Sequence, residues 1–229
     1  MSSLVVQTFT PIPVVIAYFM VAGIAAVFML LRVKPKFTTL DLTYLGIGGA
    51  IAAVADHFIG DLIFLPNGIY PIVNPPVWFR LLVLFITVAV VRKVGSGIFA
   101  AAVFDLVGDI IHFGVRGEPL WLIEDMLTYG LYLDLMVYFT KGNIFGVSET
   151  TGKGVLLVSI VEGGILGFVS SFVHPIFTMG TIAPIVFGRI FNAQAVVYYL
   201  ITYIIGNTPF GAFAGVVANR VGRLVSQTV

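Results

Sequence analysis

The chain alternates long apolar segments with short polar connections. The apolar segments are roughly 15 to 29 residues long, and most have the length that a helix needs to cross a hydrocarbon core of about 30 Å. The pattern predicts seven membrane-spanning helices, the third of them short and the last interrupted, at Pro11–Arg32, Leu40–Leu65, Val77–Val91, Gly95–Val115, Leu120–Phe139, Gly154–Thr178 and Ala193–Val221.

Positive charge follows the same alternation. The first, third and fifth connections and the carboxyl-terminal region hold Arg32, Lys34, Lys36, Arg92, Lys93, Lys141, Lys153, Arg220 and Arg223, whereas the opposite connections hold only Arg80, Arg116 and Arg189. Lysine and arginine concentrate on the cytoplasmic side of membrane proteins. We therefore expect a multi-pass protein of the cell membrane, with its amino terminus outside and its carboxyl terminus in the cytoplasm.

Composition supports the membrane assignment. With 59% hydrophobic residues, 10% charged residues and a mean hydropathy of +1.07, the chain lies far outside the range of soluble proteins. The longest connection, about Thr140 to Lys153, is too short to form a core of its own. The absence of cysteine excludes disulfides, thiolate metal sites and a cysteine nucleophile. The expected fold is an all-α, polytopic transmembrane helical bundle.

Polar and aromatic side chains gather at one membrane depth. The expected topology places a set of such residues in the outer half, and the inner half holds chiefly Asp134 and Glu162. Ionisable residues at membrane depth are costly and usually functional. The outer set is Asp56, His57, Asp61, Arg80, Asp105, Asp109, His112, Trp121, Glu124, Asp125, Tyr129, His174 and Tyr198.

This outer set predicts a substrate-binding cavity that opens to the outside. Its six carboxylates outnumber its one arginine, Arg80, with Arg116 and Glu118 at the rim. We expect such a cavity to favour a cationic or hydrogen-bonding molecule, and its aromatic rings to add stacking or cation–π contacts. The net charge of +1 gives no indication of nucleic-acid binding.

The segment Leu120–Phe139 carries the clearest part of this pattern. At α-helical spacing, Trp121, Asp125, Tyr129 and Tyr132 share one face, so the sequence predicts one carboxylate and three rings on one wall of the cavity. The alternative is a structural polar seam between packed helices.

Small residues mark the inner half of the second segment. Gly46 and Ala50, and likewise Gly49 and Ala53, form small-xxx-small pairs that let another helix approach closely. These four residues serve either packing within the chain or the docking of a separate membrane subunit, and the sequence leaves both open.

The sequence also gives expectations for two connections and for the last helix. The loop Pro66–Pro76 is expected outside, where it could cap a pocket. The stretch Gly180–Phe191 fits a loop, an interfacial helix or a re-entrant piece. Pro209 in the last segment removes a backbone donor and predicts a kink.

The polar residues also suit other functions. His57, Asp61, Asp109 and His112 offer imidazole and carboxylate ligands for a divalent metal, but no familiar zinc motif such as H-E-x-x-H occurs. The acids also suit a proton or ion relay, although no internal repeat is visible. No G-x-S-x-G context for hydrolysis is present. We therefore expect no enzymatic activity, no resident metal and no cofactor.

Three stretches together resemble a known family: the small-residue face Gly46–Ala55, the segment VVRKVGSGIFAAAVFDLVGDIIHFG (Val90–Gly114) and LTYGLYLDLMVYF (Leu127–Phe139). They are similar to the substrate-binding S-components of energy-coupling factor (ECF) vitamin importers, and most to the branch that takes up the hydroxymethylpyrimidine part of thiamine. The resemblance implies a six-helix core at residues 37–229 and an extra amino-terminal helix within residues 1–36.

The resemblance also implies roles and partners. Asp105, Asp109, Trp121, Asp125 and Tyr129 would contact the vitamin or its precursor. A transmembrane coupling subunit and a pair of ATPase subunits would complete the importer, because this chain has no phosphate-binding loop of the G-x-x-x-x-G-K-[ST] type. Two alternatives stay open: an ion- or proton-coupled carrier that acts alone, and a structural subunit of a larger membrane complex.

Overall fold

The computed structural model describes residues 7–66, 68–114, 118–148 and 152–227. Within these residues the chain forms helices and no strands, which confirms the all-α bundle. The helical elements, which include 3₁₀ and π-helical turns, are α1 (Ile12–Val33), α2 (Thr39–Val54), η1 (Ala55–Gly60), α3 (Pro75–Val91), α4 (Ser96–Phe113), α5 (Pro119–Asp125), η2 (Met126–Gly130), α6 (Leu131–Phe139), η3 (Ile144–Gly146), α7 (Lys153–Ser170), η4 (Val173–Ile182), α8 (Ala183–Phe187) and α9 (Ala193–Ser226).

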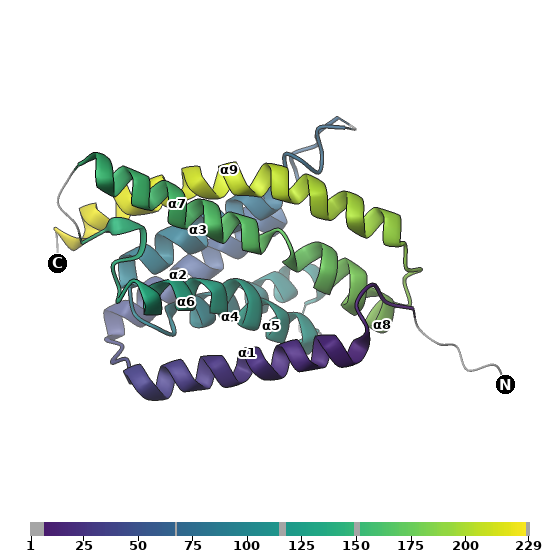
Figure 1. Ribbon diagram of the computed structural model, residues 1–229, viewed down its shortest axis with the longest axis horizontal. Coiled ribbons are helices and arrows are strands. Elements are labelled where there is room, and N and C mark those ends of the chain that lie inside the picture. Colours follow the sequence, from purple (N-terminus) through teal and green to yellow (C-terminus); the bar gives the residue numbers. More distant parts are fainter. Residues whose placement is uncertain (1–6, 67, 115–117, 149–151, 228–229) are drawn as a thin grey trace.

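These elements run mostly along the long axis of the molecule (Figure 1). In the described part of the chain, four stretches are long and apolar enough to cross a membrane: α1, α2 with η1, α7 through α8, and α9. The shorter apolar α3 lies among them. Because long apolar helices of this kind suit lipid rather than water, the chain is a membrane protein.

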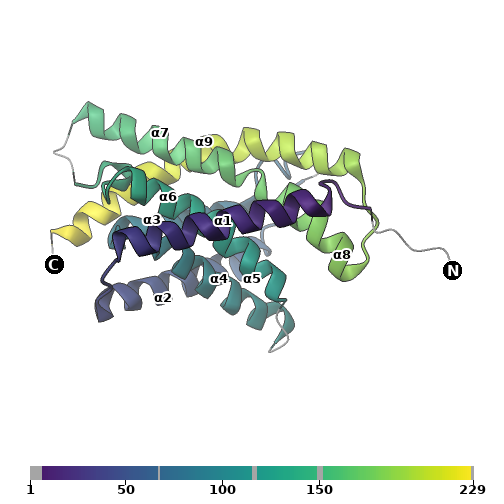
Figure 2. The same ribbon diagram turned by 60° about the horizontal axis from the view of Figure 1, so that its bottom comes forward.

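Glycines allow α7 and α9 to approach closely, and the two helices lie side by side in both ribbon views (Figures 1 and 2). A Cβ atom at Gly163 of α7 would lie 2.3 Å from the carbonyl oxygen of Gly211 in α9, and one at Gly167 would lie 2.2 Å from that of Asn207. Small residues thus bring the two backbones into contact, as is typical of helix pairs in lipid.

Part of the small-residue face of α2 packs inside the chain. Gly49 and Ala53 are buried, and a Cβ atom at Gly49 would lie 2.6 Å from the carbonyl oxygen of Ala100 in α4. For these two residues the structure therefore favours packing within the chain over docking of a separate subunit. Gly46 and Ala50 stay half-exposed, and no atom lies within 4 Å of a Cβ built at Gly46.

The amino-terminal helix α1 lies along one edge of the bundle, against η2 and α6 (Figure 1). Its buried face consists of Val15, Ala22, Ala26 and Met29. The hydroxyl of Tyr18 is 3.0 Å from the carbonyl oxygen of Leu127 and 3.0 Å from the hydroxyl of Tyr132.

The last two predicted segments differ from their expected bounds. The sixth continues through η4 and α8 to Phe187, so most of the stretch Gly180–Phe191 is helical. The seventh is not interrupted, because α9 runs from Ala193 to Ser226 with Pro209 inside it. A neighbouring group supports this region, since the indole Nε1 of Trp78 donates to Asn207 Oδ1 at 3.1 Å.

The loop after η1 packs against α9. The ring centroids of Tyr70 and Tyr199 are 6.3 Å apart, and a Cβ atom at Gly206 would overlap the carbonyl oxygen of Ile72. The described part of Pro66–Pro76 therefore covers a side of α9, and its residues do not line the cavity described below.

Carboxylates join the elements at the end of the bundle that holds the basic connections. Asp134 of α6 accepts hydrogen bonds from the amides of Gly97 and Ile98, at 2.9 and 3.0 Å, and so caps the amino terminus of α4. Glu162 of α7 accepts from the amide of Phe145. These two inner acids thus bind backbone amides, which is a structural role.

Candidate functional site

A cavity of about 390 Å³ lies at the other end of the bundle, among η1, α3, α4, α5 and η4. Ligand sites in proteins are typically of about this size or larger. Its lining combines acids, imidazoles and rings: His57, Arg80, Phe104, Asp105, Gly108, Asp109, His112, Trp121, Glu124, Asp125, His174 and Thr178.

Among the described residues, Arg80 is the one lysine or arginine of this lining, and it is already paired. Its Nε and Nη2 each lie 2.5 Å from Asp56 Oδ2, and its Nη1 lies 3.9 Å from Asp125 Oδ1. The guanidinium carbon lies over the rings of Phe104 and Tyr129, at 4.5 and 5.0 Å from their centroids. Asp56 therefore neutralises Arg80 from behind the cavity, and the remaining lining carboxylates determine its charge.

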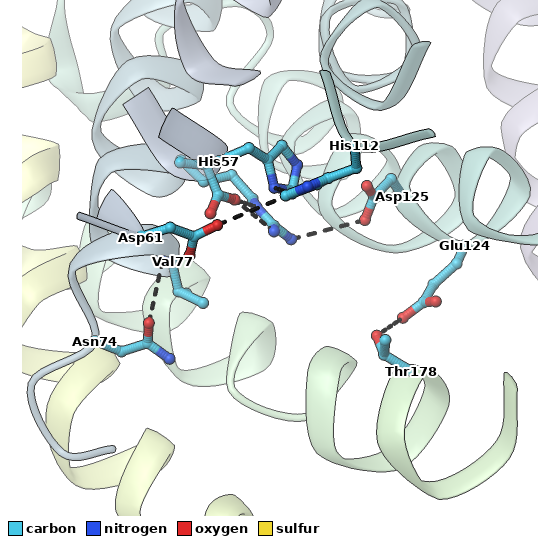
Figure 3. Close-up of polar contacts among 10 residues, drawn as sticks. His57, Asp61, Asn74, Val77, His112, Glu124, Asp125 and Thr178 are labelled. Atoms are coloured by element: carbon cyan, nitrogen blue, oxygen red, sulfur yellow. Dashed lines mark hydrogen bonds and ion pairs between the residues drawn. The ribbon is translucent and has the colours of Figure 1, made fainter. Parts of the chain in front are cut away.

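Three buried oxygens around the cavity have no hydrogen-bond partner within the described protein. They are Asp105 Oδ2, Glu124 Oε2 and the hydroxyl of Tyr129. The other oxygen of Glu124 accepts from the hydroxyl of Thr178 at 2.6 Å (Figure 3). Buried polar groups are nearly always satisfied in folded proteins. These oxygens therefore offer acceptors to a molecule that enters the cavity with hydrogen-bond donors.

The rim of the cavity is formed where η1 and α4 end. Asp109 Oδ2 accepts from the amide of Glu118 at 2.9 Å, which ties α4 to the start of α5. His57, Asp61 and His112 lie together at this rim (Figure 3). Asp61 follows the membrane-spanning helix, where partial desolvation and the charge of Asp56 raise the pKa of its carboxyl. The predicted rim residue Arg116 lies outside the described residues.

Rings form the remaining walls. The indole of Trp121 packs against Phe187 of α8, with centroids 5.2 Å apart. The imidazole of His174 stacks on Tyr203 of α9, with centroids 5.9 Å apart and planes at 17°. The extension of the sixth segment thus places Phe187 against the indole of a lining residue.

The predicted aromatic face of Leu120–Phe139 is only partly formed. The π-helical segment η2 shifts the register of the side chains, because a π-turn adds one residue to the repeat. Trp121 and Asp125 line the cavity, and Tyr129 lies beneath Arg80. Tyr132 contacts Tyr18 of α1 instead, so its predicted place on the cavity wall is wrong.

Most of the predicted site residues come together. Nine of them line the cavity: His57, Arg80, Asp105, Asp109, His112, Trp121, Glu124, Asp125 and His174. Asp56 and Tyr129 flank Arg80, and Asp61 lies next to His112 at the rim. Tyr198 does not join them. Its side chain is half-exposed on α9, where it contacts Tyr199.

Sequence reasoning missed three lining residues, Phe104, Gly108 and Thr178. Thr178 lies four residues after His174 on one helical segment, and this spacing was the available signal. Phe104 and Gly108 are apolar residues in an apolar segment, so their types gave no indication of a site.

Comparisons with known proteins place no further constraint on the site: no family model, no curated protein and no solved structure matches this chain.

Proposed function

We propose that the chain is the substrate-binding subunit of an ATP-driven, ECF-type importer, and that it captures a thiamine-related or similar aromatic vitamin or precursor. The observation that carries the proposal is the acid-lined cavity in which Asp56 neutralises Arg80, the one arginine among the lining residues that the structure describes. A protonated pyrimidine or a thiazolium would offer the positive charge, donors and flat ring that such a cavity binds.

The lining gives each part of such a molecule a partner. Asp105 and Glu124 supply free acceptor oxygens close to the charge of Asp125. The indole of Trp121 supplies an apolar surface. Affinity then arises from burial of the ring, and selectivity arises from charged hydrogen bonds that a neutral ring cannot make.

We also propose how the chain is oriented in the membrane and which subunits it works with. The cavity faces the outside of the cell membrane, and the basic end faces the cytoplasm, as the distribution of lysine and arginine favours. A transmembrane coupling subunit and two ATPase subunits supply the energy. In this assembly the chain itself binds and releases the substrate and catalyses no reaction.

Equilibrium binding tests the proposal. The purified chain in detergent is titrated with thiamine and with hydroxymethylpyrimidine, and we expect saturable binding. Asp105→Asn should weaken that binding roughly tenfold or more, because a hydrogen bond to a charged group contributes about 1.5–3 kcal/mol. The matched control is Asp134→Asn, a buried acid at the opposite end of the bundle, which should leave the affinity unchanged. Failure of every aromatic vitamin and precursor to bind would refute the proposal.

A second candidate is an ion- or proton-coupled carrier that acts alone. The observation in its favour is that Asp105 and Glu124 are buried with unpartnered oxygens, which also suits proton transfer. Vesicles that contain this chain alone distinguish the two. A carrier accumulates substrate when an ion gradient is applied, whereas a binding subunit requires its ATPase partners.

A further inference from the structure

Three metal-ligating side chains converge at the rim of the cavity. His57 Nδ1 and His112 Nε2 are 3.1 Å apart, and Asp61 Oδ2 is 3.9 Å from the same atom of His112. One ligand atom from each residue lies within 4.8 Å of the other two. Figure 3 shows the three side chains directed toward a common point from the end of η1 and the last turn of α4.

The separation of the two imidazole nitrogens is close to that in a metal site. With bonds of about 2.0–2.1 Å, a tetrahedral zinc ion holds its ligand atoms about 3.3 Å apart. The two imidazoles already lie near this separation. Asp61 is the more distant ligand, but its side chain is 51% exposed and its carboxylate is therefore free to approach. Two imidazoles and one carboxylate form a donor set that suits Zn²⁺ and other divalent transition metals.

The surroundings hold His57 in place. Its ring stacks on Phe104, with centroids 5.3 Å apart and planes at 24°. A Cβ atom at residue 108 would lie 2.7 Å from the Nε2 and Cδ2 atoms of His57, so glycine at this position leaves room for the imidazole. The ring is thus fixed with its Nδ1 toward His112 and its Nε2 toward Gly108, one turn earlier in α4. Such support of a ligand by its neighbours is typical of metal sites.

We propose that His57, Asp61 and His112 bind a divalent transition-metal ion at the rim of the cavity. Three protein ligands leave one tetrahedral position for water or for a donor atom of a bound molecule. Because the two histidines also line the cavity, that position is accessible from it. The ion would join η1 to the end of α4. This site goes beyond the proposed function, which requires no metal, and it replaces the expectation from sequence that no metal is resident.

Cobalt provides a direct test. The full-length purified chain is stripped with a chelator, titrated with Co²⁺ and then challenged with Zn²⁺. We expect one equivalent of Co²⁺ to give visible absorption bands, and Zn²⁺ to displace it. We also expect Zn²⁺ to raise the unfolding temperature, because an ion that binds only the folded state stabilises it by mass action.

Variants identify the ligands. His112→Ala and Asp61→Asn should each abolish the saturable cobalt absorption, and the exposure of Asp61 makes its substitution compatible with folding. The chain contains three histidines, so His174→Gln is the matched control. His174 stacks on Tyr203 on another wall of the cavity, and its substitution should leave the cobalt spectrum unchanged.

Two results would overturn the metal site: no saturable binding of Co²⁺ or Zn²⁺ by the wild-type chain, or saturable binding that persists in both His112→Ala and Asp61→Asn. Vitamin binding is measured separately on the metal-free chain. Loss of metal binding with vitamin binding intact therefore rejects this site alone, and the converse rejects only the proposed function.

Discussion

Arg80 of α3 and Asp56 of η1 form a buried ion pair, with Nε 2.5 Å from Oδ2 and side-chain exposures of 12% and 3%. The pair joins two helices behind the cavity. It also neutralises Arg80, the one arginine in the described part of the lining, so that its charge does not repel a cationic ligand. It therefore contributes to both the architecture and the selectivity of the site.

Removing only one partner of this ion pair should destabilise the folded chain. Arg80→Met leaves Asp56 buried without its partner, and we expect a loss of about 3 kcal/mol in the free energy of unfolding. The double variant Asp56→Asn/Arg80→Met removes both charges and should recover most of that loss. Thermal unfolding in detergent, followed by tryptophan fluorescence, measures both. Equal destabilisation in the single and double variants would show that the charges are not coupled.

Two adjacent glycines of α7 should respond in opposite ways to the same substitution. A Cβ atom at Gly163 would lie 2.3 Å from the carbonyl oxygen of Gly211, whereas one at Gly164 meets no atom closer than 3.9 Å. Gly163→Ala should therefore force α7 and α9 apart and destabilise the chain by about 2 kcal/mol. Gly164→Ala is the control and should gain up to about 1 kcal/mol in helix propensity. Unfolding temperatures that change alike in both variants would contradict the close packing.

Because Asp134 caps α4, its replacement should lower the stability of the chain by an amount that depends on the substitution. Asp134→Ala leaves the amides of Gly97 and Ile98 without their acceptors and should cost about 2 kcal/mol of stability, as for other lost helix caps. Asp134→Asn keeps one acceptor oxygen and should cost less. Hydrogen exchange of the first turn of α4 provides the local measurement. The reverse order of the two variants would indicate a role for the charge itself.

Tyr18 anchors α1 to the rest of the bundle. Tyr18→Phe removes its hydrogen bonds to Leu127 and Tyr132 and should cost about 1 kcal/mol, with faster hydrogen exchange along α1. Tyr132→Phe preserves the bond from Tyr18 to the Leu127 carbonyl and should have a smaller effect. Unchanged exchange in α1 after Tyr18→Phe would show that apolar contacts alone hold this helix.

The sequence by itself determined the all-α class, the membrane environment, the approximate positions of the helices and most of the polar residues of the cavity. Helix length and apolar composition are local properties, and lipid imposes the same requirement on every spanning segment. The position of a residue within a spanning segment also indicates its depth in the membrane. Asp105, Asp125 and His174 could therefore be assigned to one end of the bundle before their contacts were known.

The tertiary structure alone decided which way each side chain points. The rotation of a helix is determined by its packing partners, and one π-turn is enough to shift that rotation. For this reason Tyr132 contacts α1 and Tyr198 lies away from the cavity. The same rotation buries Gly49 against α4. Asp56 and Arg80 are 24 residues apart, and only the packing of η1 against α3 brings them together.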